Sequence, residues 1–184
     1  MHKKLKFVTG NKGKFQEIQA GLGMSLELVT LDIPEIQSLD LVEITRHKAL
    51  MAYELVREPL IVDDTGLQIE EWNGFPGPFI KHILEAGGQE LLLRMLSGVK
   101  NRNARFTTVI GYFDGSRFSH VEGSTTGTIA HEVKGKDWGI NGIFIPEGMG
   151  LTYAEMGMTD KNKISHRGKA TRALRELLET QSLN

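Results

Sequence analysis

The stretch from Pro59 to Leu67 most constrains what this chain can fold into, because it joins an apolar run to two adjacent acids. Residues 60–62 are apolar and two of them are β-branched, which predicts a short buried strand after a proline boundary. Because side chains alternate along a strand, Asp63 and Asp64 are expected to point to opposite faces and to have different roles. Asp-Thr-Gly is also ordinary turn chemistry, so a simple turn is the competing interpretation.

The size and composition of the chain indicate one domain with a substantial core, since it has 184 residues and 40% of them are hydrophobic. A formal net charge of −1 gives no indication of a nucleic-acid or membrane surface. Cysteine is absent, which excludes disulfides and thiol chemistry. We recognise no signal peptide and no run of about 20 apolar residues, so we expect a soluble cytoplasmic protein without nucleic-acid or membrane partners.

The amino-terminal segment has the order strand, glycine loop, helix. Residues 5–8 predict a strand, the loop runs from Thr9 to Lys14, and a helix follows that Gly21 and Gly23 close. This order can place backbone N–H groups and a lysine against a phosphate. The spacing of a Walker A loop is absent, and most two-glycine loops are only turns.

Two charged residues ahead of the acid pair are further candidates. Lys48 lies in the apolar stripe of a helix predicted over 41–56, where a lysine either extends to solvent or points into a polar cavity. Glu35 lies in the polar loop before that helix, where a solvated surface acid is the default interpretation. Together with Asp63 and Asp64, these residues fit Mg²⁺-dependent chemistry on a polyphosphate.

The second half of the chain predicts strands, glycine-aromatic loops and a terminal helix. Residues 104–113, 117–123 and 124–131 predict a β-meander, to which we assign no chemistry. The loops at 72–79 and 138–142 are candidates for holding a base, and equally for covering the core beneath them.

A cationic cluster over residues 161–169 surrounds the start of the terminal amphipathic helix, with Ser165 at the N-cap position. A helix amino end already carries partial positive charge, so cationic side chains there are unfavourable by themselves. An anion bound at this end would stabilise both. A solvated basic face is the equal alternative. Zinc is not indicated, because the six histidines are scattered and cysteine is absent, and no G-x-S-x-G element supports a Ser-His hydrolase.

Four of these segments, in this order along the chain, resemble the Ham1 family of inosine/xanthosine triphosphate pyrophosphatases. They are residues 9–14, 62–67, 74–79 and 161–167. The resemblance implies an α/β fold in which a long mixed β-sheet floors a cleft between two lobes, with helices around it. It implies a single domain over 1–184 and, usually, a homodimer.

The resemblance also implies an activity and a role for each site residue. The expected reaction is Mg²⁺-dependent hydrolysis of ITP, dITP or XTP to the monophosphate and pyrophosphate, which cleanses the nucleotide pool. Asp64 is then the proton acceptor and, with Glu35, a metal ligand, while Lys14 and Lys48 stabilise the pyrophosphate. Substrate contacts are expected at Thr9, Gly10, Asn11, Lys12, Gly13, Lys14, Thr65, Trp138, Gly139, Ile140, Asn141, Lys161, Ser165, His166 and Arg167.

One segment departs from the family pattern. Where the family usually has Phe-Gly-(Tyr or Trp)-Asp-Pro, this chain has Trp138-Gly139-Ile140-Asn141-Gly142. A carboxylate only accepts hydrogen bonds, whereas an asparagine both donates and accepts, so the base edge that is recognised can change. A pyrophosphatase for another modified nucleotide is therefore an alternative. A non-catalytic nucleotide-binding module is a second one, against which the intact acids argue.

Overall fold

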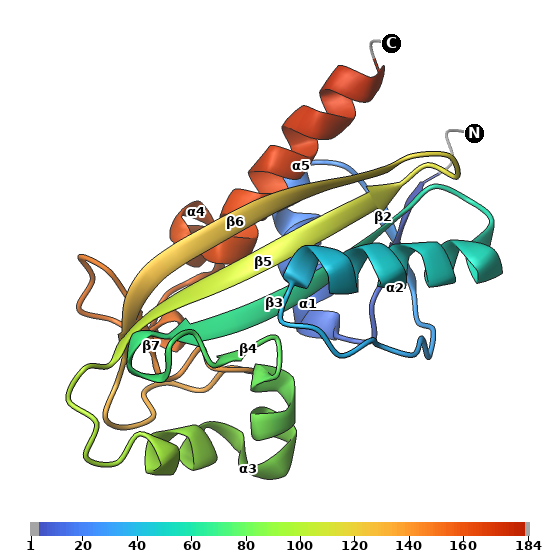
Figure 1. The fold of residues 1–184 in the computed structure, drawn as a ribbon. Helices are drawn as coiled ribbons and strands as arrows, with labels where there is room; N and C mark the ends of the chain where they lie inside the picture. The colour runs from blue at the N-terminus through green and yellow to red at the C-terminus, as the bar shows by residue number, and fades with distance from the viewer. Residues whose placement is uncertain (1–3, 183–184) are drawn as a thin grey trace.

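The computed structural model describes residues 4–182, and one mixed sheet of seven strands runs through it (Figure 1). The central strands β3, β5 and β6 are antiparallel neighbours, whereas β1 runs parallel to both β2 and β3. The strands are β1 (Leu5–Val8), β2 (Leu26–Val29), β3 (Leu60–Ile69), β4 (Pro76–Gly77), β5 (Asn103–Phe113), β6 (Phe118–Ile129) and β7 (Phe144–Pro146).

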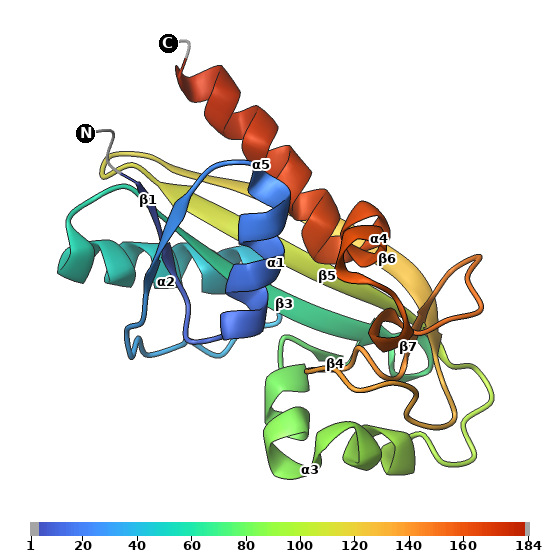
Figure 2. The ribbon, with the colours of Figure 1, turned by 180° about the vertical axis from the view of Figure 1, so that it is seen from behind.

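Helices cover both faces of this sheet. One face is covered by α1 and α5 and the opposite face by α2, while α3 packs at the far end of the long strands (Figures 1 and 2). The helices are α1 (Lys12–Leu22), α2 (Leu41–Val56), α3 (Ile80–Met95), α4 (Met158–Ile164), α5 (His166–Ser182), and the short 3-10 helices η1 (Glu70–Trp72) and η2 (Tyr153–Glu155). Within the described residues, no helix combines the length and apolarity needed to cross a bilayer.

The side chains of β3 divide the core between the two faces of the sheet. Leu60 and Val62 pack in the cluster under α2, whereas Ile61 packs with residues of α1 and α5. Leu67 and Ile69, on the same face as Ile61, pack with α3. This alternation places the β3 residues that pack with α1, α5 and α3 on one face of the strand and those that pack under α2 on the other.

One edge of β3 is unpaired in its middle. β1 pairs with that edge at Leu60 and Ile61, and β4 pairs with it at Leu67 and Gln68. Along residues 62–66 no strand of the described chain pairs there, although β5 pairs with the other edge throughout. The two acids lie in this interval, so side chains from both faces of the strand can reach one opening.

Three expectations about element boundaries were wrong. Helix α1 begins at Lys12 rather than after Lys14, because the Asn11 side chain caps it by accepting a hydrogen bond from the Lys14 N–H at 3.1 Å. Gly21 lies inside α1, and Gly23, in the left-handed conformation, ends it alone.

The third correction concerns the strands after the hairpin turn. Residues 118–129 form one strand, β6, and not two, since β5 pairs with it without interruption. Gly123 suggests a break in the sequence, but its function is steric. A Cβ there would overlap the backbone of His166 and Ala170, so the glycine lets α5 lie directly on the sheet.

Candidate active site

A cavity of about 560 Å³ opens at the unpaired edge of β3, between residues of α1 and α3. Most of the predicted site residues line it, from segments far apart in the chain. They are Thr9, Gly10, Asn11, Lys14, Glu35, Lys48, Asp63, Asp64, Thr65, Trp138, Gly139, Ile140 and Arg167. The others lie outside this lining: Lys12 is exposed on α1, Gly13 lies beneath Trp138, and Asn141, Lys161, Ser165 and His166 are buried.

The amino end of α1 is organised by local hydrogen bonds. The N–H of Thr9 donates to the carbonyl of Val29 at 3.0 Å, and the Thr9 hydroxyl accepts from the Asn11 N–H at 3.1 Å. With Asn11 as the N-cap, Lys14 lies in the first turn of the helix. A helix amino end carries partial positive charge, so this corner of the cavity favours an anion.

The two acids lie in different surroundings, as the alternation predicts. The Asp63 side chain is buried, 3.1 Å from Lys14 Nζ and 3.6 Å from Arg167 Nε. Burial alone would raise the pKa of Asp63, but Lys14, Arg167 and Lys48 outweigh it and hold the pKa below its usual value. Asp64 is only half-buried, and its Oδ1 accepts a hydrogen bond from the Thr65 N–H at 2.9 Å. Asp64 is therefore the more exposed of the two acids.

Lys48 points into the cavity instead of extending to solvent. Its ammonium lies 2.6 Å from Glu35 and within 3.5 Å of the Asp63 carbonyl. Burial would lower the pKa of Lys48, but Asp64, Glu35 and Asp63 together raise it, so the side chain is charged at neutral pH. Glu35 likewise is more than a surface acid. Burial would raise its pKa, but Lys48 and Lys81 lower it to about 2.

Lys81 was missed in the sequence. It lies in the first turn of α3, and its Nζ reaches Glu35 at 3.1 Å, so it connects the two sides of the cavity. In the sequence, Lys81 carries no local signal that distinguishes it from a solvated surface lysine.

The cationic cluster at 161–167 is largely neutralised by the chain itself. Glu17 Oε1 lies 2.7 Å from Lys161 Nζ, and Glu17 Oε2 lies 2.7 Å from Arg167 Nη1. All three side chains are buried, so the anion expected at this helix end is Glu17 of α1 rather than a ligand. Arg167 also donates to the Thr65 hydroxyl at 3.1 Å, which ties the cluster to β3. The sequence offered one hint of Glu17, an acid three residues after Lys14.

Only one of the two glycine-aromatic loops contributes an aromatic ring to the cavity. Trp138 lines it, with Arg167 5.2 Å and Lys161 5.7 Å from its ring centroid. The indole lies directly on Gly13, where a Cβ would overlap Nε1. In the other loop, Trp72 packs against the core, Phe75 is exposed and the Phe79 ring stacks on His82 with centroids 6.3 Å apart, so none of these rings lines the cavity.

His166 is a buried neutral imidazole. It is fully buried with its ring centroid 3.8 Å from that of Phe106, and neither ring nitrogen has a hydrogen-bond partner in the described residues. Burial, together with the nearby charges of Arg167 and Lys161, lowers the pKa of His166 well below 6.5. Its neighbour Ser165 caps α5, as predicted, by accepting the Gly168 N–H at 3.0 Å.

We expect the stability of the protein to fall as the pH is lowered from about 6.5. The unfolded chain then binds a proton at His166 that the folded chain does not, so the unfolding free energy declines by about 1.4 kcal/mol per pH unit until the folded-state pKa is reached. Urea denaturation between pH 8 and 5 measures this slope. His166→Phe is expected to flatten it, whereas His131→Gln, at an exposed site, serves as the control. An unchanged slope in His166→Phe would contradict the assignment.

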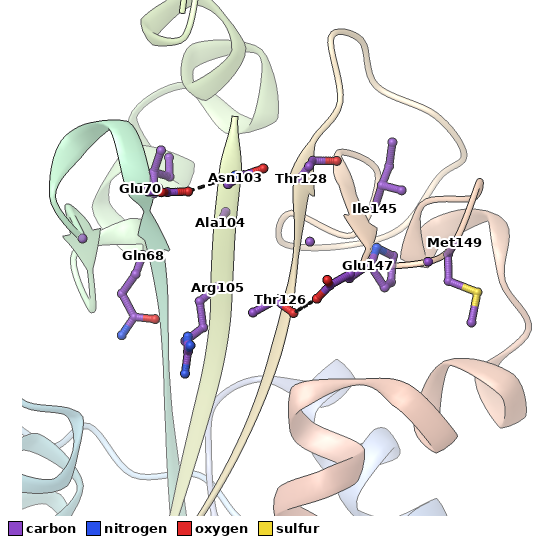
Figure 3. Close-up of a pocket in the computed structure, with 15 residues that line it drawn as sticks. Gln68, Glu70, Asn103, Ala104, Arg105, Thr126, Thr128, Ile145, Glu147 and Met149 are labelled. Atoms are coloured by element: carbon purple, nitrogen blue, oxygen red, sulfur yellow. Dashed lines mark hydrogen bonds between the residues drawn. The ribbon is translucent and has the colours of Figure 1, made fainter. Parts of the chain in front are cut away.

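A second cavity, of about 580 Å³, lies at the far end of the sheet (Figure 3). Gln68, Arg105 and Thr126 are cross-strand neighbours there, on the face that α2 covers further along the strands. Glu147 accepts a hydrogen bond from Thr126, and Asn103 donates to Glu70 at 2.9 Å. None of the predicted site residues lines this cavity.

Among residues 4–182, no group of three or more His, Cys, Asp or Glu side chains is arranged to hold a metal ion. An all-protein cage is therefore absent from the described chain. Glu35 and Asp64 nevertheless both line the cavity and offer hard oxygen donors. That donor set fits Mg²⁺, which commonly takes one or two carboxylates and shares its other positions with water and phosphate.

The sequence model of the Ham1 family matches residues 5–177. The chain belongs to the Ham1 family. The dITP/XTP pyrophosphatase of Methanopyrus kandleri is 45% identical over 172 residues, covering 91% of this chain and 92% of the relative. That of Korarchaeum cryptofilum is 40% identical over 174 residues, covering 94% of each. The solved Staphylococcus aureus Ham1 protein superposes with a TM-score of 0.82 at 25% identity, over 97% of this chain and 100% of that one.

These comparisons confirm the family resemblance that four motifs indicated, and with it the expected fold class of a mixed sheet surrounded by helices.

Proposed function

We propose that this Ham1 protein hydrolyses dITP, XTP and ITP to the nucleoside monophosphate and pyrophosphate, and so removes non-canonical purine nucleotides from the pool. The observation that carries the proposal is the convergence of Asp64, Glu35, Lys14 and Lys48 at one opening beside the amino end of α1. Its relatives named dITP/XTP pyrophosphatase support the choice of substrate.

The phosphate end of the substrate is assigned to the α1 corner of the cavity. The N–H groups of the first helical turn and the ammonium of Lys14 supply positive charge there. Lys48 adds a second cation from the α2 side, because its raised pKa keeps it protonated. Preorganised charge of this kind stabilises the negative charge that develops on departing pyrophosphate.

Asp64 is assigned as the proton acceptor. Its Oδ1 already accepts the Thr65 N–H, which leaves Oδ2 to take a proton from water as the water oxygen attacks the α-phosphorus. The bond to the bridging oxygen breaks and pyrophosphate leaves. Asp63 does not suit this role, because it is buried against Lys14 and Arg167.

Glu35 and Asp64 would hold Mg²⁺, and the ion would supply further charge neutralisation to the phosphates. Glu35 is ionised throughout the physiological pH range, since its pKa is about 2. Because removal of the ion would remove this charge neutralisation, we expect EDTA to abolish turnover and added Mg²⁺ to restore it.

The test is pyrophosphate release with Mg²⁺ from ITP, XTP and dITP against GTP, ATP and the canonical dNTPs. We expect release from the first three at rates well above the rest. Release from none of them would favour a nucleotide-binding module. Equal release from all would remove the base selectivity. A preference for another modified nucleotide would support the alternative that the altered 138–142 segment raises.

We also propose that the protein is a homodimer and acts in the cytoplasm, where the nucleotide pool is used. The sheet end around the second cavity extends beyond α2 and offers a surface for a second copy (Figures 1 and 3). Light scattering of the purified chain tests the assembly, and twice the chain mass is the expected result.

A further inference from the structure

The carboxylate of Asp137 makes three contacts, and Asp137 lies outside the motifs identified in the sequence. Its Oδ1 accepts the Trp138 N–H at 2.8 Å. Its Oδ2 accepts from the Asn141 amide at 2.8 Å and lies 3.2 Å from Lys161 Nζ. One carboxylate thus contacts the backbone of Trp138, the amide of Asn141 and the buried ammonium of Lys161.

The Asp137 carboxylate lies next to Asn141, the residue at which this chain differs from the family pattern. The resemblance set out in the sequence analysis implies an acid at the position where this chain has Asn141. Because Asp137 Oδ2 lies within hydrogen-bond distance of the Asn141 amide, a negative charge is retained beside that position. In this chain the acid is residue 137, four residues before position 141.

We propose that Asp137 is the positioning residue of the base end of the site, and that it replaces the acid which the family pattern carries at position 141. The proposal rests on the proposed function, because it concerns recognition of the base of that substrate. Asp137 acts through Lys161, Asn141 and Trp138, and it is not itself a catalytic residue.

Charge balance supports this role. Lys161 is buried and lies between two carboxylates, Glu17 at 2.7 Å and Asp137 at 3.2 Å. Glu17 also pairs with Arg167 through its other oxygen, so it is shared between two cations. A buried ammonium needs close anionic partners, and Asp137 supplies the one that Glu17 cannot supply alone.

Asp137 also determines how the Asn141 side chain is oriented. A carboxylate can only accept, so Asn141 must present its NH₂ group to Asp137 and its carbonyl oxygen elsewhere. The same carboxylate anchors the backbone of Trp138, whose ring lies on Gly13 next to Lys161 and Arg167. Loss of the charge at Asp137 therefore weakens its contacts with Lys161 and Asn141, although an amide oxygen at 137 can still accept the Trp138 N–H.

Binding of the product halves tests the proposal without turnover. In Asp137→Asn we expect the Kd for inosine monophosphate to rise about 10-fold, since a hydrogen bond to a charged group is lost, while the Kd for pyrophosphate is unchanged. With dITP as substrate, KM should rise by a similar factor at nearly constant kcat. The matched control is Asp160→Asn, whose exposed carboxylate pairs with Lys163 at 2.8 Å on α4, outside both the cavity lining and the Asp137 contacts.

A charge swap separates positioning from a general loss of structure. Asn141→Asp alone places two carboxylates within hydrogen-bond distance and should also weaken binding of inosine monophosphate. The double variant Asp137→Asn/Asn141→Asp restores the family order and should return the Kd to within about threefold of the parent. Additive losses in the double variant would overturn the proposal, even if Asp137→Asn alone is unstable.

The failures of the two proposals are distinguishable. A parent protein that releases pyrophosphate from no nucleotide in the panel would end the proposed function. An active parent in which Asp137→Asn and Asp160→Asn bind inosine monophosphate equally well would overturn the role of Asp137 alone.

Discussion

Replacement of Asp64 by asparagine is expected to lower kcat by about 10³-fold or more while the Kd for dITP changes little. The variant keeps the size of the side chain and an oxygen for the Thr65 N–H, but it loses the proton acceptor, and general base catalysis typically contributes about 10²–10⁴-fold. Loss of a metal ligand adds to the effect. Single-turnover release of pyrophosphate gives the rate, and calorimetric titration gives the Kd.

The neighbouring acid supplies the control. Asp63→Asn leaves Lys14 and Arg167 without their shared carboxylate inside the protein, so we expect a higher KM and a lower unfolding free energy. Asp64→Asn should therefore change mainly kcat, whereas Asp63→Asn should change mainly KM and the unfolding free energy. Turnover retained in Asp64→Asn, or abolished only in Asp63→Asn, would reverse the assignment of the two acids.

Glu17→Ala is expected to lower the unfolding free energy by about 3–5 kcal/mol, which is a large part of the stability of a domain. The substitution leaves Lys161 and Arg167 buried, at 4% and 2% side-chain exposure, without the carboxylate that pairs with both. Asp137 and Asp63 compensate only in part, at 3.2 Å and 3.6 Å. Urea denaturation of the parent and the variant measures the difference.

Asp160→Ala is the matched comparison, because it removes an acid whose lysine partner remains exposed to water. It should leave the denaturation midpoint almost unchanged. Glu17→Gln retains the volume of the side chain, so it separates loss of charge from loss of packing. If both Glu17 variants unfold at the parent midpoint, the buried cluster does not stabilise the fold.

Several features of the site follow from local pattern. The alternation along residues 60–67 predicted that Asp63 and Asp64 would have different surroundings, and they do. The apolar stripe of α2 singled out Lys48 as a lysine that either extends to solvent or points into a polar cavity, and the structure shows the second. The N-cap at Ser165 was also predictable, since capping involves only the next few residues.

Other features could not be predicted in this way. Gly123 lies within the uninterrupted strand β6, where α5, a helix distant in the sequence, packs against it. The sequence alone does not distinguish a glycine required by such a close contact from a glycine in a turn. Lys81 and Asp137 carried no local signal that distinguished them from solvated surface charges. Their contacts with Glu35 and Lys161 come from segments 46 and 24 residues away.

The sequence by itself determined the buried strand that carries the two acids, the strand–glycine loop–helix order of the amino-terminal segment and the helix that carries Lys48, and its motifs indicated the family. The elements depend on periodicity over a few residues and the family on the order of its motifs, and a linear sequence records both. Only the tertiary structure decided which charges are paired. Glu17 meets Lys161 and Arg167 across 144 and 150 residues, and burial determines how strongly each pair holds. For that reason the cationic cluster at 161–167, ambiguous in the sequence, is largely an internal ion network, and the opening beside β3 is where Asp64, Glu35 and the two lysines converge.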